Sequence, residues 1–334
     1  MTSLDPGTAA LLERLVARGE AAMFAGTDTA AGIDAARARF ATLMSETVRP
    51  VDRAPEVRDD GPVPVRVHRP VTPSGALVVH VHGGGWVLGG GEVYDPVAQR
   101  LADDTGAVVV ALDHRLAPEH PYPAPHDDVV AAVEWVLAHS DDWVLDPSRL
   151  GLAGDSAGAN LVAGAALALR DSPSLRSPRG DAGPAVVGTL LVYPPPDFEG
   201  RYPSVKENAE GYFLTAGDVV ACSKLYLGGT SPKGETRLSP LRADLAGLGP
   251  TIVATAGFDP LRDAGRAFAE ALTTAGVDAR LREHPTLTHG FLGFTGVSSG
   301  ADEAVAALHA EFAELLARPR RPGAVATGRY DQQS

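Results

Sequence analysis

The stretch Gly154-Asp155-Ser156-Ala157-Gly158 decides the fold, because it joins an apolar run at 149–153 to an Ala/Leu-rich run at 160–169. The first run predicts a strand and the second a helix, so the serine stands at a sharp turn between them. Small neighbours permit the strained backbone of such a turn, and Gly-x-Ser-x-Gly in this setting is the nucleophile elbow. We therefore predict that Ser156 projects from the end of a strand as a nucleophile.

A second glycine-rich segment, His82-Gly83-Gly84-Gly85-Trp86, follows the apolar run 76–81. Glycine has no Cβ, so the N–H groups of consecutive glycines can approach a reacting carbonyl oxygen closely, as an oxyanion hole requires. An ordinary loop is the alternative interpretation of this segment. Beside an elbow serine the segment predicts acyl-transfer chemistry, with His82 as the residue that organises the loop.

An acid and a base are required downstream, because a serine hydroxyl is a poor nucleophile without an imidazole that a carboxylate orients. After a nucleophile elbow the expected chain order is serine, acid, histidine. Asp259 follows the buried run 251–256, and His289 follows the strand-like run 279–283. Both positions are strand ends, so we predict that Asp259 and His289 meet Ser156 at one edge of the sheet.

Three other residues compete for these two roles. Asp263 and Glu283 are alternative acids, and His284 is an alternative base. We expect Asp263 on a helix, Glu283 inside a strand and His284 beside a strand as a packing residue, which makes each less suitable. Asp259 precedes a proline, so it is expected to cap a helix as well.

Strands and helices alternate along most of the chain, which predicts an α/β fold with a mostly parallel sheet and helices on both faces. Helical spacing of apolar residues opens the chain at 4–24 and 33–44, and period-two spacing marks a strand at 63–67. Further strands are expected at 76–81, 106–112, 150–153, 186–193, 251–256 and 279–283.

Residues 194–240 interrupt this alternation. Three consecutive prolines begin a polar and aromatic segment that leaves the carboxyl end of a strand, where ligands of parallel sheets bind. We expect this insertion and the N-terminal helices at 1–55 to form a small helical cap, with 56–193 and 241–318 as the core. The tail at 319–334 has little apolar content and is expected to be flexible.

Composition excludes several classes of function. The 334 residues carry a net charge of −13, which disfavours nucleic acid as a partner. No run approaches the ~20 apolar residues that span a bilayer, and no basic and apolar leader opens the sequence. The single Cys222 fits a reducing compartment. We therefore expect a cytoplasmic protein without a membrane span.

Five histidines are candidate metal ligands by their spacing, but we reject a metal site. His80 and His82 share one strand face, and His114, His120 and His126 recur at equal spacing. Proline-rich turns separate the last three, no cysteine pair assists them, and no HExxH pattern is present. We predict that the protein uses neither a metal nor another cofactor.

A group of charged residues lies beside apolar sequence after the strand expected at 106–112. Buried charges need an opposite partner. We therefore predict that Asp113, Arg115 and Glu119 form a turn with a buried ion pair and take no part in catalysis.

Four motifs resemble those of the bacterial hormone-sensitive-lipase-like carboxylesterases of the α/β-hydrolase superfamily. The similarity extends from about residue 63 to residue 294 and includes the stretches 113–124 and 207–213. The motifs are the glycine segment at 82–86, the elbow at 154–158, Asp259-Pro-Leu and His289-Gly-Phe.

The resemblance implies the α/β-hydrolase fold, with Ser156 as the nucleophile, His289 as general base and then acid, and Asp259 as the orienting carboxylate. It also implies a cap over the pocket. Three aromatic residues, Trp86, Tyr212 and Phe213, either line that pocket or simply pack. The oxyanion donors that the resemblance implies are the N–H groups of Gly83, Gly84 and Ala157.

From this resemblance we expect a carboxylesterase that hydrolyses small, uncharged esters of short or medium acyl chains through an acyl-enzyme. Amide or arylformamide hydrolysis by the same triad differs only in the leaving group and stays open. A non-catalytic ligand-binding receptor and a protein whose main role is assembly are alternatives of other classes. A homodimer is a further hypothesis, for which the sequence identifies no interface.

Overall fold

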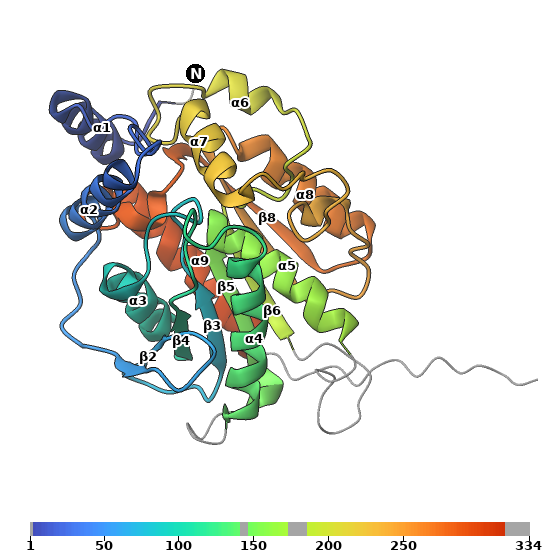
Figure 1. The fold of residues 1–334 in the computed structure, drawn as a ribbon. Coiled ribbons are helices and arrows are strands. Elements are labelled where there is room, and N and C mark those ends of the chain that lie inside the picture. The colour runs from blue at the N-terminus through green and yellow to red at the C-terminus, as the bar shows by residue number, and fades with distance from the viewer. Residues whose placement is uncertain (1–2, 141–145, 173–185, 318–334) are drawn as a thin grey trace, which may run out of the picture.

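An eight-stranded sheet forms the centre of the described chain, in the order β1-β2-β4-β3-β5-β6-β7-β8 (Figure 1). The structure is a computed structural model that describes residues 3–140, 146–172 and 186–317, so the tail predicted at 319–334 lies outside the described residues. Strand β2 runs antiparallel to β1 and β4, and the other neighbouring pairs are parallel. The strands are β1 (Glu56–Arg58), β2 (Val65–His68), β3 (Leu77–Val81), β4 (Val108–Leu112), β5 (Leu150–Asp155), β6 (Val186–Val192), β7 (Thr251–Phe258) and β8 (Ala279–Thr288).

Helices cover both faces of this sheet, which confirms the predicted α/β fold. In Figure 1, α4 (Ala124–Ala138) and α5 (Ala157–Asp171) lie in front of the central strands, and α9 (Ser299–Ala317) lies behind them. Helix α3 (Asp95–Thr105) packs against α9, and α8 (Arg262–Thr274) packs against β7 and β8. Strands β3, β4 and β5 are buried along their whole length, which explains their nearly continuous apolar sequence. No helix within the described ranges is long and apolar enough to cross a membrane.

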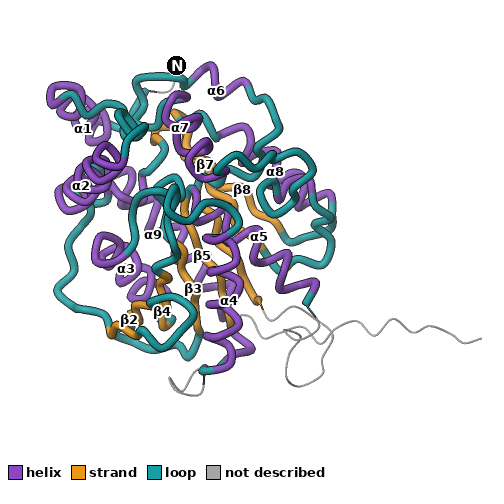
Figure 2. Tube along the Cα trace, viewed as in Figure 1, coloured by secondary structure: helices purple, strands orange, loops and turns teal. Residues whose placement is uncertain are grey.

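Helices from two distant parts of the chain lie together above the carboxyl ends of the parallel strands (Figures 1 and 2). They are α1 (Pro6–Arg18) and α2 (Ala30–Thr47) from the N-terminal region, and α6 (Pro203–Glu207) and α7 (Ala216–Leu227) from the insertion. The N–H of Phe24 donates to the buried carboxylate of Asp218 over 2.8 Å. This bond joins the N-terminal region to the insertion.

Several elements differ from the predicted ones, and three of the differences have local reasons. Helix α1 ends at Arg18, before the predicted residue 24, because Gly19 caps it in the left-handed conformation with φ 73°. Strand β8 continues through Pro285 to Thr288, because a sheet edge tolerates a residue without an N–H donor. Strand β1 is short and mostly exposed, so no apolar pattern predicted it.

The charged residues after β4 do not pair with one another, so the predicted buried ion pair among them was wrong. Arg115 pairs with Asp128 of α4 at 2.6 Å, and Glu119 pairs with Arg37 of α2 at 2.8 Å. Asp113 accepts a backbone N–H. Each partner comes from another part of the chain, and the side chains of Arg115 and Glu119 are 47% and 52% exposed.

Candidate active site

Ser156 occupies the one-residue turn between β5 and α5. Its backbone is strained, with φ 51° and ψ −121°. The flanking glycines permit the turn: a Cβ on Gly154 would lie 2.7 Å from the Gly158 carbonyl oxygen, and a Cβ on Gly158 would lie 2.1 Å from the Val81 oxygen. The turn therefore has the geometry that the Gly-x-Ser-x-Gly pattern predicts.

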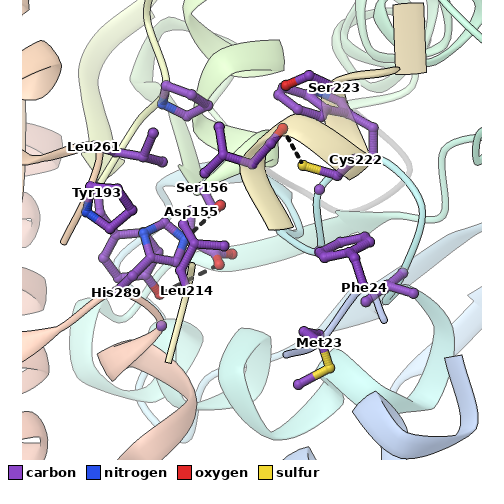
Figure 3. Close-up of a pocket in the computed structure, with 18 of the residues that line it drawn as sticks. Met23, Phe24, Asp155, Ser156, Tyr193, Leu214, Cys222, Ser223, Leu261 and His289 are labelled. Atoms are coloured by element: carbon purple, nitrogen blue, oxygen red, sulfur yellow. Dashed lines mark hydrogen bonds between the residues drawn. The ribbon is translucent and has the colours of Figure 1, made fainter. Parts of the chain in front are cut away.

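His289 lies between Ser156 and Asp259, and Figure 3 shows its ring facing the serine. Its Nε2 is 2.8 Å from Ser156 Oγ, and its Nδ1 is 2.9 Å from Asp259 Oδ2. With the ring proton on Nδ1, the imidazole donates to Asp259 and accepts the serine hydroxyl. The structure thus brings together the three residues that the sequence analysis assigned to catalysis.

Asp259 is buried directly after β7, and its two oxygens bind different partners. Oδ2 accepts from His289, whereas Oδ1 accepts the N–H of Leu261 at 2.8 Å. The second bond stabilises the turn that leads into α8. The carboxylate of Asp259 therefore orients the imidazole and holds the turn before α8. The predicted helix cap is wrong, because α8 begins at Arg262 with Leu261 at the N-cap position.

The competing residues lie in other environments. Asp263 binds Arg262 at 2.8 Å and Arg266 at 3.1 Å, and Glu283 binds Arg266 at 2.6 Å. The Nε2 of His284 is buried and has no hydrogen-bond partner within the described chain. None of these three contacts Ser156.

The three predicted oxyanion donors are in unequal positions. The N–H of Gly83 donates to Asp155 Oδ1 at 3.0 Å, so it is not free to bind an oxyanion, and this part of the prediction requires correction. The N–H groups of Gly84 and Ala157 have no assigned acceptor among the residues that the structure describes. Gly84 also lines the cavity beside Ser156. These two N–H groups are therefore the available donors of the predicted set.

A cavity of about 620 Å³ opens beside Ser156 and His289. Its wall is mostly apolar and draws on both the N-terminal region and the insertion, as Met23, Phe24 and Leu214 show in Figure 3. Large apolar cavities with a few convergent polar groups are typical of small-molecule sites. Other apolar wall residues are Phe40, Leu43, Met44, Leu88, Val97, Phe198, Leu227 and Leu261.

The predicted pocket aromatics divide into two groups. Trp86 and Phe213 line the cavity, and Trp86 also stacks on Tyr226 with ring centroids 4.4 Å apart. Tyr212 does not line it and packs against Phe258 with ring centroids 4.8 Å apart. Tyr212 is therefore not a pocket residue, and the alternative that it packs holds for it, because adjacent residues of this turn direct their side chains to different neighbours.

The histidines beneath the glycine segment are packed and neutral. His82 Nδ1 is 2.7 Å from the Gly83 carbonyl oxygen, and the His82 ring stacks on His114 with centroids 4.3 Å apart. Burial lowers the pKa of His82 to about 4 and the pKa of His114 to about 3. His82 therefore supports the loop, as predicted. Among the described residues, no group of three or more His, Cys, Asp or Glu side chains is arranged to hold a metal ion.

A sequence profile of the family described as alpha/beta hydrolase fold matches residues 78–293, which contain Ser156, Asp259 and His289. The chain belongs to the α/β-hydrolase family. This α/β hydrolase is 41% identical to carboxylesterase NlhH of Mycobacterium tuberculosis, over 84% of this chain and 89% of NlhH. It is 32% identical to ethyl acetate hydrolase of Pseudomonas putida, over 90% of this chain and 96% of the relative.

A crystal structure of a thermostable esterase from Pseudomonas putida has the same fold, with a TM-score of 0.82 and 29% identity. The match covers 95% of this α/β hydrolase and 99% of the esterase. Together with the sequence relatives, it confirms the resemblance that the four motifs predicted.

Asp155 is a candidate functional residue of this α/β hydrolase that the sequence analysis missed. It is 4% exposed at the end of β5. Burial raises its pKa to about 6, against the opposing effects of the Gly83 N–H, the charge of His289 and two tyrosine hydroxyls. The available signal was a carboxylate in the last position of an apolar strand, next to the elbow serine.

Proposed function

We propose that this α/β hydrolase is a serine carboxylesterase with Ser156 as its nucleophile. The observation that carries the proposal is the position of His289, 2.8 Å from Ser156 Oγ and 2.9 Å from Asp259 Oδ2. The named relatives, a carboxylesterase and an ethyl acetate hydrolase, support an ester as the substrate. The chain is a carboxylic ester hydrolase.

In the first half-reaction, Ser156 Oγ attacks the ester carbonyl carbon while His289 Nε2 takes the hydroxyl proton. Asp259 holds the ring through Nδ1 and stabilises the imidazolium that forms. The carbonyl oxygen becomes an oxyanion that accepts hydrogen bonds from the N–H groups of Gly84 and Ala157. The imidazolium then protonates the departing alcohol, and the acyl group stays on Ser156.

In the second half-reaction, a water molecule takes the place of the alcohol. His289 removes a proton from this water as the water oxygen attacks the acyl carbon. The same two N–H groups hold the second oxyanion. Collapse of this intermediate releases the carboxylic acid and returns the proton to Ser156, and the scheme requires no cofactor.

The cavity supports an uncharged ester of short or medium acyl chain. Its volume of about 620 Å³ and its mostly apolar wall favour apolar substituents. Each buried methylene adds at most ~0.8 kcal/mol of binding free energy until the chain reaches the wall. The buried carboxylate of Asp155 beside Ser156 disfavours a second negative charge on the substrate.

We also propose that the helices above the cavity form a cap, built from 1–55 and 194–240 on a core of 56–193 and 241–318. Wall residues from both cap segments support this division. A cytoplasmic location accords with the free, buried thiol of Cys222. A homodimer remains a hypothesis that size-exclusion chromatography with light scattering tests directly.

Hydrolysis of p-nitrophenyl esters from acetate to dodecanoate tests the proposed activity. We expect kcat/KM to rise with chain length, reach a maximum at a short or medium chain and then fall. Ser156→Ala should lower kcat by on the order of 10⁵-fold or more. Ser45→Ala, which removes an exposed hydroxyl of α2, is the matched control and should keep wild-type activity.

The same variants separate the alternatives. Faster turnover of p-nitroanilides or arylformamides than of esters would assign the triad to amide chemistry. Wild-type activity no greater than that of Ser156→Ala would exclude the carboxylesterase and leave a non-catalytic ligand-binding protein.

A further inference from the structure

The carboxylate of Asp155 lies within hydrogen-bond distance of three donors around the proposed site. Its Oδ1 accepts the N–H of Gly83 at 3.0 Å. Its Oδ2 lies 3.3 Å from the hydroxyl of Tyr94 and 3.5 Å from the hydroxyl of Tyr193. Within the described ranges, no Lys or Arg forms an ion pair with this carboxylate. It is thus a buried acid held by neutral donors alone.

The contribution of this carboxylate to stability depends on pH. Burial raises its pKa to about 6, so the folded protein binds a proton here more tightly than the unfolded chain, whose aspartates have a pKa near 3.9. A group with a raised folded pKa contributes stability below the unfolded value and loses that contribution as the pH rises through about 6. At pH 7 the ionised Asp155 therefore contributes less to the free energy of unfolding than the protonated acid contributes below pH 4.

The first contact fixes the glycine segment. The backbone of Gly83 lies directly against the carboxylate, since a Cβ there would be 2.4 Å from Asp155 Oδ2. The hydrogen bond from the Gly83 N–H therefore sets the distance between the glycine segment and the turn that carries Ser156. The next N–H along the loop is that of Gly84, which has no assigned acceptor among the described residues and lines the cavity.

The contact with Tyr193 links Asp155 to His289, the proposed general base. Tyr193, whose hydroxyl faces Asp155, packs its ring on His289 with centroids 4.4 Å apart. A negative charge at Asp155 also attracts a positive charge on His289. The imidazolium exists only after Ser156 has given up its proton, so this attraction favours the transition state over the resting enzyme.

We propose that Asp155 is a positioning residue whose ionised carboxylate holds the glycine loop so that the Gly84 N–H meets the oxyanion. Its charge also favours the imidazolium of His289. This inference rests on the proposed serine esterase activity.

The groups that face Asp155 define its response to pH. Tyr94 approaches from the start of α3, Tyr193 from the end of β6, and His289 from the turn after β8. The glycine loop contributes only His82, whose ring lies 5.3 Å from that of Tyr94 and whose pKa burial lowers to about 4. Asp259 lies beyond Tyr193 and acts on the pKa of that hydroxyl. The charge of Asp155 therefore changes near pH 6, beside the glycine loop.

Asp155→Asn tests the proposal, because the amide keeps the shape and an acceptor for Gly83 but removes the charge. At pH 8 we expect kcat for p-nitrophenyl butyrate to fall by about tenfold or more, with little change in KM. The ratio of wild-type to variant kcat should shrink as the pH falls below about 6, because protonation then neutralises the wild-type carboxyl too. The melting temperature at pH 8 should not fall.

Asp128→Asn is the matched control. It removes an equally buried carboxylate that pairs with Arg115 outside the cavity, so it should lower the melting temperature and leave kcat unchanged. Wild-type kcat in Asp155→Asn, or a kcat ratio that does not vary with pH, would overturn the proposal.

Two further variants keep the proposal testable if Asp155→Asn does not fold. Tyr94→Phe and Tyr193→Phe each remove a hydroxyl donor to Asp155, which raises its pKa and should move the acid limb of kcat to higher pH. An unmoved acid limb in both contradicts the proposal. Full activity in Ser156→Ala would instead remove the proposed esterase mechanism itself, so the two failures are distinguishable.

Discussion

At the residue scale, backbone strain is concentrated at the cavity. Among the described residues, the non-glycine residues with positive φ are Trp86 at 61°, Ser156 at 51°, Tyr193 at 39° and Phe213 at 75°, and all four line the cavity. Such conformations cost of order 1–3 kcal/mol each and persist only where the surrounding structure imposes them. The fold therefore holds its most constrained backbone where the proposed chemistry takes place.

Gly84→Ala tests the oxyanion donor at this scale. Gly84 has φ 115°, and a Cβ would lie 2.2 Å from the Leu88 carbonyl oxygen, so the loop must shift and move the N–H. Loss of one donor costs ~3 kcal/mol, so kcat for p-nitrophenyl butyrate should fall by about 100-fold. The control is Gly19→Ala at the end of α1, where φ is also positive but no atom lies within 4 Å of the new Cβ. If Gly84→Ala keeps kcat within about twofold of wild type, Gly84 is not the donor.

At the element scale, one carboxylate joins the N-terminal region to α7. Asp218 forms a capping box with Thr215 at the start of α7, and it also accepts the N–H of Phe24 at 2.8 Å. Phe24 lines the cavity, as do Val219 and Cys222 of α7. The same residue therefore begins a helix and fixes the position of two walls of the cavity.

Asp218→Ala should separate these two roles when compared with Thr215→Ala. Each variant loses one half of the capping box: Thr215→Ala removes the acceptor for the N–H of residue 218, and Asp218→Ala removes the acceptor for the N–H of Thr215. Loss of a cap costs about 1 kcal/mol, so both should lower the melting temperature. Only Asp218→Ala also releases Phe24, so only this variant should raise KM for p-nitrophenyl octanoate while kcat for the acetate stays near wild type. Equal KM values for octanoate in the two variants would show that the bond to Phe24 does not shape the cavity.

Sequence patterns predicted those turns and strand ends that depend only on residues close to one another in the chain. The elbow at Ser156 and the strand ends before Asp259 and His289 follow from apolar runs and small residues, and the structure has them in the predicted order. The bond between the Gly83 N–H and Asp155 joins residues 72 positions apart, and no sequence pattern marks it. Long-range pairing also explains why Arg115 was assigned the wrong partner.

At the scale of the whole molecule, the core contains neutral histidines. His80, His82 and His114 are buried, and burial lowers their pKa values to about 3, about 4 and about 3. Each binds a proton more tightly in the unfolded chain, where histidine has a pKa near 6.5. Their contribution to stability is therefore present above pH 6.5 and is lost as the pH falls toward the folded values.

Acid should consequently destabilise the protein steeply. Below pH 6.5 each histidine removes ~1.4 kcal/mol of unfolding free energy per pH unit, and Asp155 opposes them with the opposite sign between about pH 6 and 4. We expect urea denaturation to show a lower free energy of unfolding at pH 5 than at pH 7. His80→Gln, His82→Gln and His114→Gln combined should reduce that difference. Equal free energies of unfolding at the two pH values would contradict this account.

Covalent labelling of the nucleophile tests the central claim most directly. Incubation with a p-nitrophenyl alkylphosphonate, followed by peptide mass spectrometry, identifies the residue that attacks an activated ester analogue. We predict release of one equivalent of p-nitrophenolate per chain, one adduct on Ser156, and no adduct in Ser156→Ala. An adduct on another residue, or equal labelling of the wild type and Ser156→Ala, would contradict the assignment of Ser156 as the nucleophile.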